Sequence, residues 1–521
     1  MYDFGLLLDP LFWLSCVITS AAIYIYRCIM DSLDYPPGPK KWPIIGNLPN
    51  IDIANPHKSF LALSKQYGPV FTIWLPRPII VIADFDVLKD INSHYAMQIA
   101  GRPQGFVYGI FTNHQKDGNG IILCQGARWS AQRRFALKTF RNFGMGKGIM
   151  EHRINKHKGL LLQRMENVCD LRTRIGVIDL HLHISFCVGN IINDLVMGRH
   201  YQYGDDEFYK FKTLIDNTLK GFASKSMQFV DYFPFLRFVV PYYYQYIKEG
   251  FEIQKFFLKE IDCHEKAYDK DTEPTNFIDA YLRDMHNQDD PYLSKATLAL
   301  DAGDLWTGGL ETTVTSLRWA IIYLIRYPEI QAKLQNEIDH VLDLSLPTIS
   351  HRQQMPYVQA TLDEILRIIN VLPWGIPHET IEDVKIGGYD IKAGTVLMPQ
   401  IGVIHFDENN FPNGEEFNPE RFLNENGEYK SNKKLIPFGM GKRACLGESL
   451  ARMELFLIFV SLLQNFSFYS YNDILPSLER NPGMTNVPKE YKCEIRQRRS
   501  FIIADEIISD AFKKCEEKQK F

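Results

Sequence analysis

The sequence has little that points to nucleic acid or to a disulfide-rich scaffold. Its formal net charge is −4, and it contains no RNA- or DNA-binding motif. Its nine cysteines are odd in number, scattered, and never arranged as CxxC. This pattern disfavours a disulfide framework and a structural zinc site, and it suggests a reducing compartment.

The chain also lacks linkers, repeats and low-complexity tracts between about residue 50 and residue 499. Its 521 residues would allow several domains on length alone, since domains commonly run ~100–200 residues. Because no internal boundary is visible, we expect one large domain over 31–498. The charged tail, 499–521, carries no recognisable chemistry.

The N-terminus contains an uncharged run, "PLFWLSCVITSAAIYIY", which ends at Tyr26. A membrane-spanning helix typically needs ~17–25 residues. No basic region precedes the run, as it would in a cleaved signal peptide, and the cations Arg27, Lys40 and Lys41 follow it. We therefore expect residues 1–30 to form a transmembrane anchor that leaves the remaining chain in the cytosol, with a buried core helix as the alternative.

A proline-rich segment, "YPPGPKKWPIIGNL", follows the run. Proline fixes the backbone towards polyproline geometry, so residues 31–49 are expected to form a semi-rigid spacer.

Periodicity along the rest of the chain predicts a mainly α fold of the α+β type, with small sheets. "YGPVFTIWLPRPIIVIADFDVLKDIN" predicts a β-hairpin followed by a helix, and helical periodicity dominates from about 127 to 342. "VKIGGYDIKAGTVLMPQIG" predicts a second hairpin, with Gly387 and Gly388 in its turn.

One cysteine, Cys445, stands in unusual surroundings within "LIPFGMGKRACLGESLARMELF". Gly439 and Gly441 permit a tight turn, and helical periodicity begins one residue after the cysteine. A helix N-terminus and the nearby Lys442 and Arg443 would favour the thiolate. Such a thiolate is a nucleophile or a soft metal ligand, and a buried structural cysteine is the remaining interpretation.

The ten residues "FGMGKRACLG" resemble the haem-binding signature FxxGxRxCxG of the cytochrome P450 family at every fixed position. The resemblance implies that Cys445 is the axial thiolate ligand of haem b iron and that Arg443 binds a haem propionate. It also implies that Phe438 shields the sulfur and that Gly447 approaches the haem closely. From the spacer to about residue 497 the chain is similar to the animal microsomal branch, whose members oxidise drugs and fatty acids.

A second motif lies within "DAGDLWTGGLETTVTSLRWAIIYLIRY". Ser294 is a candidate N-cap and Pro328 opens the next helix, so one helix of about thirty residues is expected. Gly308 and Gly309 at its centre would cost about 2 kcal/mol relative to alanine. Close helix–helix packing and a groove against a haem face would each explain them.

"GGLETT" resembles the oxygen-binding stretch [AG]GxET[TS] of the same family, although alanine is commoner than glycine at position 308. The resemblance implies that Thr312 and Glu311 are catalytic. The Thr312 hydroxyl would take the helical hydrogen bond of the Gly308 carbonyl and protonate reduced dioxygen, with Glu311 relaying protons.

Glu364 and Arg367 are one helical turn apart, and alone they would indicate an ordinary solvated pair. In the family this spacing is the ExxR pair, which the arginine of a PERF-like segment completes, here Arg421. The resemblance implies a structural role: a buried glutamate between two arginines locks the loop that presents Cys445.

Trp129 and Arg133 match the family's WxxxR pattern, whose indole and guanidinium groups donate to the haem propionates. An aromatic anchor beside a solvated cation is the alternative. His378 falls where microsomal relatives place another propionate donor. Some relatives also have an arginine about twelve residues before the tryptophan, but Asp117 stands there in this chain.

Comparison with the family's variable recognition regions gives a mostly apolar substrate pocket. Its expected lining is Phe106, Trp306, Gly308, Gly309, Val371, Ile376 and Met484.

Seven cations are expected to form a basic face around the thiolate: Arg128, Arg134, Lys138, Arg141, Lys433, Lys434 and Lys442. Ordinary solvated charge is the alternative. No flavin or Rossmann motif is present, so the resemblance implies that an NADPH-dependent flavoprotein reductase docks on this face, with cytochrome b5 as a second candidate donor. The aromatic segment Phe233–Val240 is expected to dip into the bilayer, with core packing as the alternative.

The sequence therefore predicts a monooxygenase of the endoplasmic reticulum membrane that faces the cytosol and inserts one oxygen atom from O2 into a fatty acid, steroid or xenobiotic. One alternative is a haem-thiolate isomerase or dehydratase that rearranges a peroxide without O2. The other is a non-catalytic haem carrier or sensor.

Overall fold

The computed structural model describes residues 12–16, 18–19, 22–23, 34–145, 148–287, 290–481 and 483–499. The predicted anchor over 1–30 and the tail beyond Arg499 therefore lie largely outside the described residues. Within the described ranges, no helix is both long enough and apolar enough to cross a bilayer.

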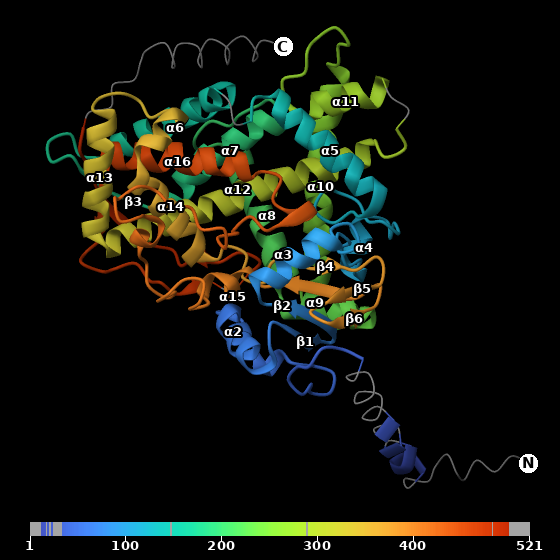
Figure 1. Ribbon diagram of the computed structural model, residues 1–521. Coiled ribbons are helices and arrows are strands. Elements are labelled where there is room, and N and C mark those ends of the chain that lie inside the picture. The colour runs from blue at the N-terminus through green and yellow to red at the C-terminus, as the bar shows by residue number, and fades with distance from the viewer. Residues whose placement is uncertain are drawn as a thin grey trace, which may run out of the picture.

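The described chain is mainly helical, as predicted (Figure 1). Its α-helices are α2 (Pro56–Tyr67), α3 (Phe85–His94), α4 (Phe106–Phe111), α5 (Gly126–Asn142), α6 (Gly148–Val168), α7 (Leu180–Val196), α8 (Asp206–Ala223), α9 (Lys225–Tyr232), α10 (Tyr243–Lys266), α11 (Phe277–Asn287), α12 (Lys295–Arg326), α13 (Pro328–Leu342), α14 (Pro356–Ile369), α15 (Ile401–Phe406) and α16 (Glu448–Asn465). The 3-10 turns are η2 (Leu48–Asn50), η3 (Pro234–Phe238), η4 (Ile349–Gln354), η5 (Pro419–Phe422) and η6 (Gly441–Arg443).

Within the described ranges, the strands are short and form four small sheets. They are β1 (Val70–Leu75), β2 (Arg77–Ile82), β3 (Ile175–Ile178), β4 (His378–Glu379), β5 (Val384–Ile386), β6 (Tyr389–Ile391), β7 (Val396–Pro399), β8 (Phe466–Ser470), β9 (Arg480–Asn481), β10 (Val487–Pro488) and β11 (Cys493–Gln497). The sheet orders are β1-β2-β7-β4, β3-β11-β8, β5-β6 and β10-β9.

Both predicted hairpins are confirmed. β1 pairs antiparallel with β2, from Val70 opposite Ile82 onward, and α3 follows; β7 then joins β2 in parallel. β5 and β6 meet at Gly387 and Gly388, whose φ angles of +55° and +90° are the left-handed values that a two-residue hairpin turn requires.

The helix α12 crosses the middle of the molecule, and the β1-β2-β7-β4 sheet lies below it at one end (Figure 1). It begins at the predicted N-cap, where the Ser294 side chain accepts a hydrogen bond from the Thr297 N–H, and it ends before Pro328. Its 32 residues span ~48 Å. Apolar side chains of α12 pack with those of α6, α7, α14 and α16 into the main core.

The expected spacer is not separate from the globule. The Thr72 N–H donates to the Pro37 carbonyl (3.0 Å) and its hydroxyl donates to the Pro36 carbonyl (2.7 Å), so the proline segment lies against β1. A Cβ at Gly38 would stand 1.9 Å from the Thr72 carbonyl oxygen, which explains glycine at this close approach.

Candidate active site

Cys445 lies in a glycine-shaped loop just before α16. Gly439 and Gly441 both have φ near +77°, and a Cβ at Gly441 would meet the Asn92 side chain at 1.7 Å. The Cys445 N–H donates to the Phe438 carbonyl at 2.8 Å, which closes the loop. The helix begins at Glu448, so the cysteine precedes the helix instead of standing at its first residue.

The Cys445 thiol is accessible to solvent although protein surrounds most of it. Burial raises the pKa of the thiol, and the N–H of Gly447 and the cation of Arg133 only partly oppose this effect. Arg133 is the cation that lowers the pKa of this thiol, whereas Arg443 donates to the carbonyls of Ala100 and Cys124. A bound metal cation would supply the missing stabilisation, since a coordinating thiol is deprotonated outright.

Three guanidinium groups gather near this loop, and one of them is unexpected. Arg133 Nη2 donates to the Ala444 carbonyl at 2.6 Å. Arg443 lies with its guanidinium carbon 4.0 Å from the centroid of the buried Trp129 ring. Arg102, which no sequence motif had indicated, donates to the Ile122 carbonyl at 3.1 Å, a group that Arg443 also approaches.

These three arginines form no ion pair with any carboxylate in the described part of the chain. Burial and mutual repulsion lower the pKa of Arg102 to about 10 and of Arg443 to about 9. An uncompensated cluster of positive charge favours a dianionic ligand, such as the two propionates of a haem.

His378 borders the same cluster. Its Nδ1–H donates to the Ile99 carbonyl (2.9 Å), and burial, followed by Arg102, lowers its pKa to about 3. Donation from Nε2 to a propionate therefore requires the protonated ring, which a bound carboxylate would favour. Asp117 contributes only its backbone carbonyl, which accepts from the Gln125 N–H.

The two central glycines of α12 lie in different surroundings. A Cβ at Gly308 would meet nothing within 4 Å, and this glycine is exposed in a helix whose neighbours are mostly buried. A Cβ at Gly309 would meet Ile192 of α7 at 2.8 Å. Gly308 therefore faces open space beside α12, which we call the groove, and Gly309 permits close packing of α12 against α7.

Thr312 shares the groove face with Gly308, and its hydroxyl donates to the Gly308 carbonyl at 2.9 Å. Glu311 points instead towards α8. Burial raises the pKa of the Glu311 carboxyl, while the cation of Lys212 on α8 acts in the opposite direction. A raised pKa keeps a carboxyl protonated nearer neutrality, as a proton donor requires.

Glu364, Arg367 and Arg421 form a buried network. Arg367 donates twice to the Glu364 carboxylate (2.7 and 2.8 Å), and Arg421 Nε donates to it at 3.1 Å. Arg367 also donates to the carbonyl of His405, whose Nε2 accepts from the Ile436 N–H at 2.9 Å. His405, which no sequence motif had indicated either, thus connects the network to the Cys445 loop.

The residues expected to line the substrate pocket are dispersed. Trp306 is fully buried among the side chains of the main core, and it donates its indole N–H to Asn193 of α7 at 2.7 Å. The Ile376 carbonyl accepts from Arg102, next to the arginine cluster. Phe106 packs with α9, and Met484 is exposed on the surface.

Val371 is partly buried against the main core, and its carbonyl accepts from the Asn486 N–H at 2.9 Å.

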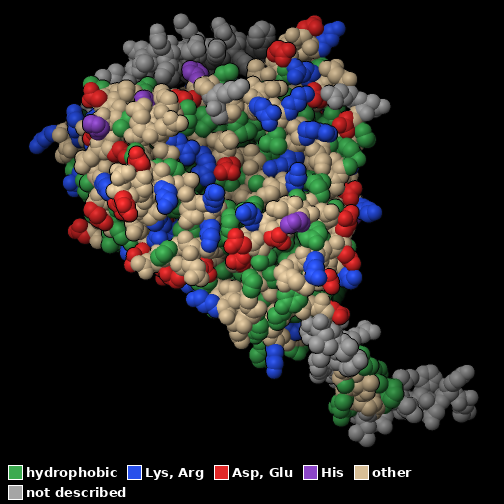
Figure 2. Space-filling model, viewed as in Figure 1, with side chains coloured by type: hydrophobic (Ala, Val, Ile, Leu, Met, Phe, Trp, Pro, Cys, Tyr) green, Lys and Arg blue, Asp and Glu red, His purple; other side chains and the backbone are tan. Residues whose placement is uncertain are grey.

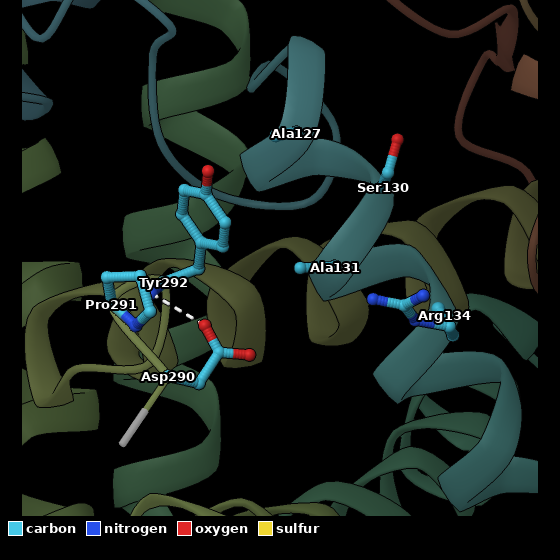
Figure 3. Close-up of a pocket in the computed structure, with 7 residues that line it drawn as sticks. All are labelled: Ala127, Ser130, Ala131, Arg134, Asp290, Pro291 and Tyr292. Atoms are coloured by element: carbon cyan, nitrogen blue, oxygen red, sulfur yellow. Dashed lines mark hydrogen bonds between the residues drawn. The ribbon is translucent and has the colours of Figure 1, made fainter. Parts of the chain in front are cut away.

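A hollow of about 640 Å³ opens on the outer side of α5 (Figure 3). It is lined by Ala127, Ser130, Ala131, Arg134, Asp290, Pro291 and Tyr292. Of these residues, only Arg134 was expected from the sequence to have a role, as part of the basic face. The hollow is a surface feature beside α5.

The accessible thiol, the arginine cluster without carboxylate partners and the open space beside α12 together fit a planar, dianionic metal cofactor. These are the groups that a haem-thiolate protein uses to hold its haem. A family model described as Cytochrome P450 matches residues 36–495. The chain therefore belongs to the cytochrome P450 family and is a haem-dependent monooxygenase.

Curated relatives agree with this assignment. The chain is 37% identical to a 3-ketosteroid oxygenase of Caenorhabditis elegans over 467 residues, which cover 88% of this chain and 80% of the relative. It is 33% identical to Cytochrome P450 2E1 of Bos taurus over 501 residues, which cover 94% and 98%. Cytochrome P450 2J3 of Rattus norvegicus is 35% identical over 441 residues, which cover 84% and 86%.

Proposed function

We propose that the protein is a microsomal haem-thiolate monooxygenase in which Cys445 is the iron ligand. The observation that carries this proposal is the pairing of an accessible thiol with three arginines that lack carboxylate partners among the described residues. Arg102, Arg133, Arg443 and a protonated His378 would hold the propionates, with the Trp129 indole N–H as a further donor.

The bound haem supplies the site of O2 activation, and a thiolate ligand favours O–O cleavage. The protein's own contribution is to position protons. The Thr312 hydroxyl lies on the groove face and is the proton donor nearest to it, while the Glu311 carboxyl, whose raised pKa favours its protonated form, would act from the α8 side. Gly308 leaves the space in which O2 and substrate meet.

An NADPH-dependent flavoprotein reductase is the proposed electron donor, with cytochrome b5 as a second one. Figure 2 shows Lys and Arg side chains gathered over the middle of the face on which α5 and α16 lie in Figure 1. Arg134, Lys138 and Arg141 are exposed on α5, and no carboxylate of the described chain pairs with them. Raising ionic strength should slow reduction by the reductase, whereas an unchanged rate would contradict electrostatic docking.

The proposed location is the endoplasmic reticulum membrane, with the catalytic domain in the cytosol. Phe235, Phe238 and Val239 are each at least 66% exposed, as expected for a segment that meets lipid. Trp42 is also exposed, and its segment bonds to Trp74 of β1 through the Asn47 N–H. Arg77, the first residue of β2, lies over the Tyr232 ring of α9.

The proposed substrate is a lipophilic small molecule: a steroid, a fatty acid or a xenobiotic. The name of the Caenorhabditis elegans relative supports the steroid class. Spin-state shifts of the purified holoenzyme should be titrated with steroids, fatty acids and aromatic xenobiotics. Turnover with 18O2, NADPH and reductase should then place one labelled atom in the product.

The same assay separates the alternatives. A product formed from a hydroperoxide without NADPH would indicate an isomerase or dehydratase. Haem binding without turnover of any ligand that shifts the spin state would indicate a carrier or sensor.

A further inference from the structure

The described chain leaves the fold at one end of the β3-β11-β8 sheet. β11 ends at Gln497, whose N–H donates to the Arg174 carbonyl (2.9 Å) next to β3. Arg499, two residues later, donates to Asp339 (2.9 Å) and to the Asp343 carbonyl at the end of α13. The chain therefore enters the undescribed tail on the α13 side of the sheet.

Exposed apolar side chains flank this exit. Leu344, which follows α13, is 75% exposed, and Leu171, in the turn before β3, is 100% exposed. The edge strand β3 turns Ile175 and Val177 outward. We name these four side chains the sheet-end patch, a surface that soluble proteins normally cover or charge.

The tail sequence "FIIADEIISDAFKKC", residues 501–515, contains apolar residues that can cover such a patch. Its apolar residues recur at i, i+3, i+4, i+7, i+8 and i+11, which predicts an amphipathic helix. The residues on this apolar side are Ala504, Ile507, Ile508, Ala511, Phe512 and Cys515.

The length of the predicted helix matches the patch. Twelve helical residues span ~18 Å, and three strands ~4.8 Å apart beside one helix ~10 Å wide give about 20 Å between the two ends of the patch. The helix would start near Leu344, where Arg499 is held by Asp339, and end near Leu171.

We propose that the tail helix covers the sheet-end patch, running from Leu344 to Leu171 across the end of the sheet. The tail lies beyond residue 495, where the match to the family model ends. The contact would bury the apolar side of the tail helix together with the four exposed side chains of the sheet-end patch.

A disulfide within the full-length holoenzyme tests this placement, because Cys515 is predicted to end next to Leu171. Leu171→Cys should form an intramolecular disulfide with Cys515 under mild oxidation. Leu344→Cys is the matched control, and it should react at least about tenfold more slowly, since only the first pair shares a high effective concentration. Cys515→Ser should abolish the product.

Two further variants test the helix face. Ile508→Glu should prevent the disulfide, and Ser509→Glu, on the polar side, should leave it intact. Equal rates for the two cysteine pairs would overturn the proposal. A product of twice the mass would show instead that a second copy covers the patch, and loss of the disulfide on adding phospholipid vesicles would show that a membrane binds the tail.

Discussion

Thr312 donates its side-chain hydroxyl to the carbonyl oxygen of Gly308, 2.9 Å away and one helical turn earlier on α12. Ser316 repeats this bond to the Thr312 carbonyl at 2.8 Å. Hydroxyl groups that bond to carbonyls one turn earlier loosen the helix locally. The Thr312 hydroxyl is thus held by the helix itself, one turn after Gly308, whose surroundings are open.

Replacing Thr312 with alanine should uncouple oxygen reduction from product formation. General acid–base groups contribute ~10²–10⁴-fold, so product formed per NADPH should fall at least about tenfold while hydrogen peroxide accumulates. Thr312→Ser keeps the hydroxyl and should remain coupled. Normal coupling in the alanine variant would contradict a proton-delivering role.

The adjacent glycines should respond in opposite ways to alanine. Gly309→Ala places a methyl group 2.8 Å from Ile192 and should destabilise the protein by about 1–3 kcal/mol. Gly308→Ala meets nothing within 4 Å and should stabilise the helix by up to about 1 kcal/mol. Thermal unfolding of both holoenzymes measures the difference, and equal shifts would refute the assignment.

Glu364→Gln should lower the free energy of unfolding more than a substitution that removes an exposed ion pair. The side chains of Glu364 and Arg367 are fully buried, and removing one charge of a buried pair costs about 3–5 kcal/mol. Urea unfolding and haem content should both show the loss. Asp383→Asn breaks an exposed pair with Lys392 and should change neither, so a similar effect in both variants would count against the network.

Stability should depend on pH through Asp304. Burial raises the pKa of its carboxyl to about 7, well above the value in an unfolded chain. The protonated form is thus favoured in the fold, and this contribution is complete below about pH 4 and lost as pH rises through about 7.

Asp304→Asn should therefore flatten the stability profile between about pH 4 and pH 8 and raise stability at the alkaline end. The amide oxygen can still accept from the Ile122 N–H, which bonds to Asp304 at 2.9 Å, so the fold is kept. Parallel unfolding curves for both proteins across this range would refute the shift. Burial, and next the charge of Asp304, also raise the pKa of the Asp301 carboxyl. The stability profile of Asp301→Asn should therefore be measured for comparison.

The sequence was sufficient to predict the turns and helix ends that are determined by residues close together in the chain. Glycines at 387 and 388 indicated a hairpin turn, and Ser294 and Pro328 bounded α12, because capping and turn geometry are local properties.

Arg102 was missed for the opposite reason. It reaches the cluster from a loop, through carbonyls at Ile122 and Ile376 that lie 20 and 274 residues away in sequence. No short pattern contains such a contact. The same holds for His405, whose bond to Ile436 forms only when the chain folds.

Helix geometry distinguishes Trp306 from the other α12 residues that were expected to line the pocket. Residues two apart on a helix differ by ~200° in direction, so Trp306 and Gly308 point to opposite sides. Thr312, four residues after Gly308, returns to the groove. The angular positions along α12 therefore put Gly308 and Thr312 on one face and Trp306 on the other, a distinction that sequence spacing alone contains.

The most direct test of the account is the absorption spectrum of the purified, reduced protein under carbon monoxide. Thiolate ligation by Cys445 predicts a strongly red-shifted Soret band, and Cys445→Ala should lose that band while circular dichroism shows a retained helical fold. A colourless wild-type protein, or a Soret band typical of imidazole-ligated haem that survives the substitution, would contradict the assignment of Cys445.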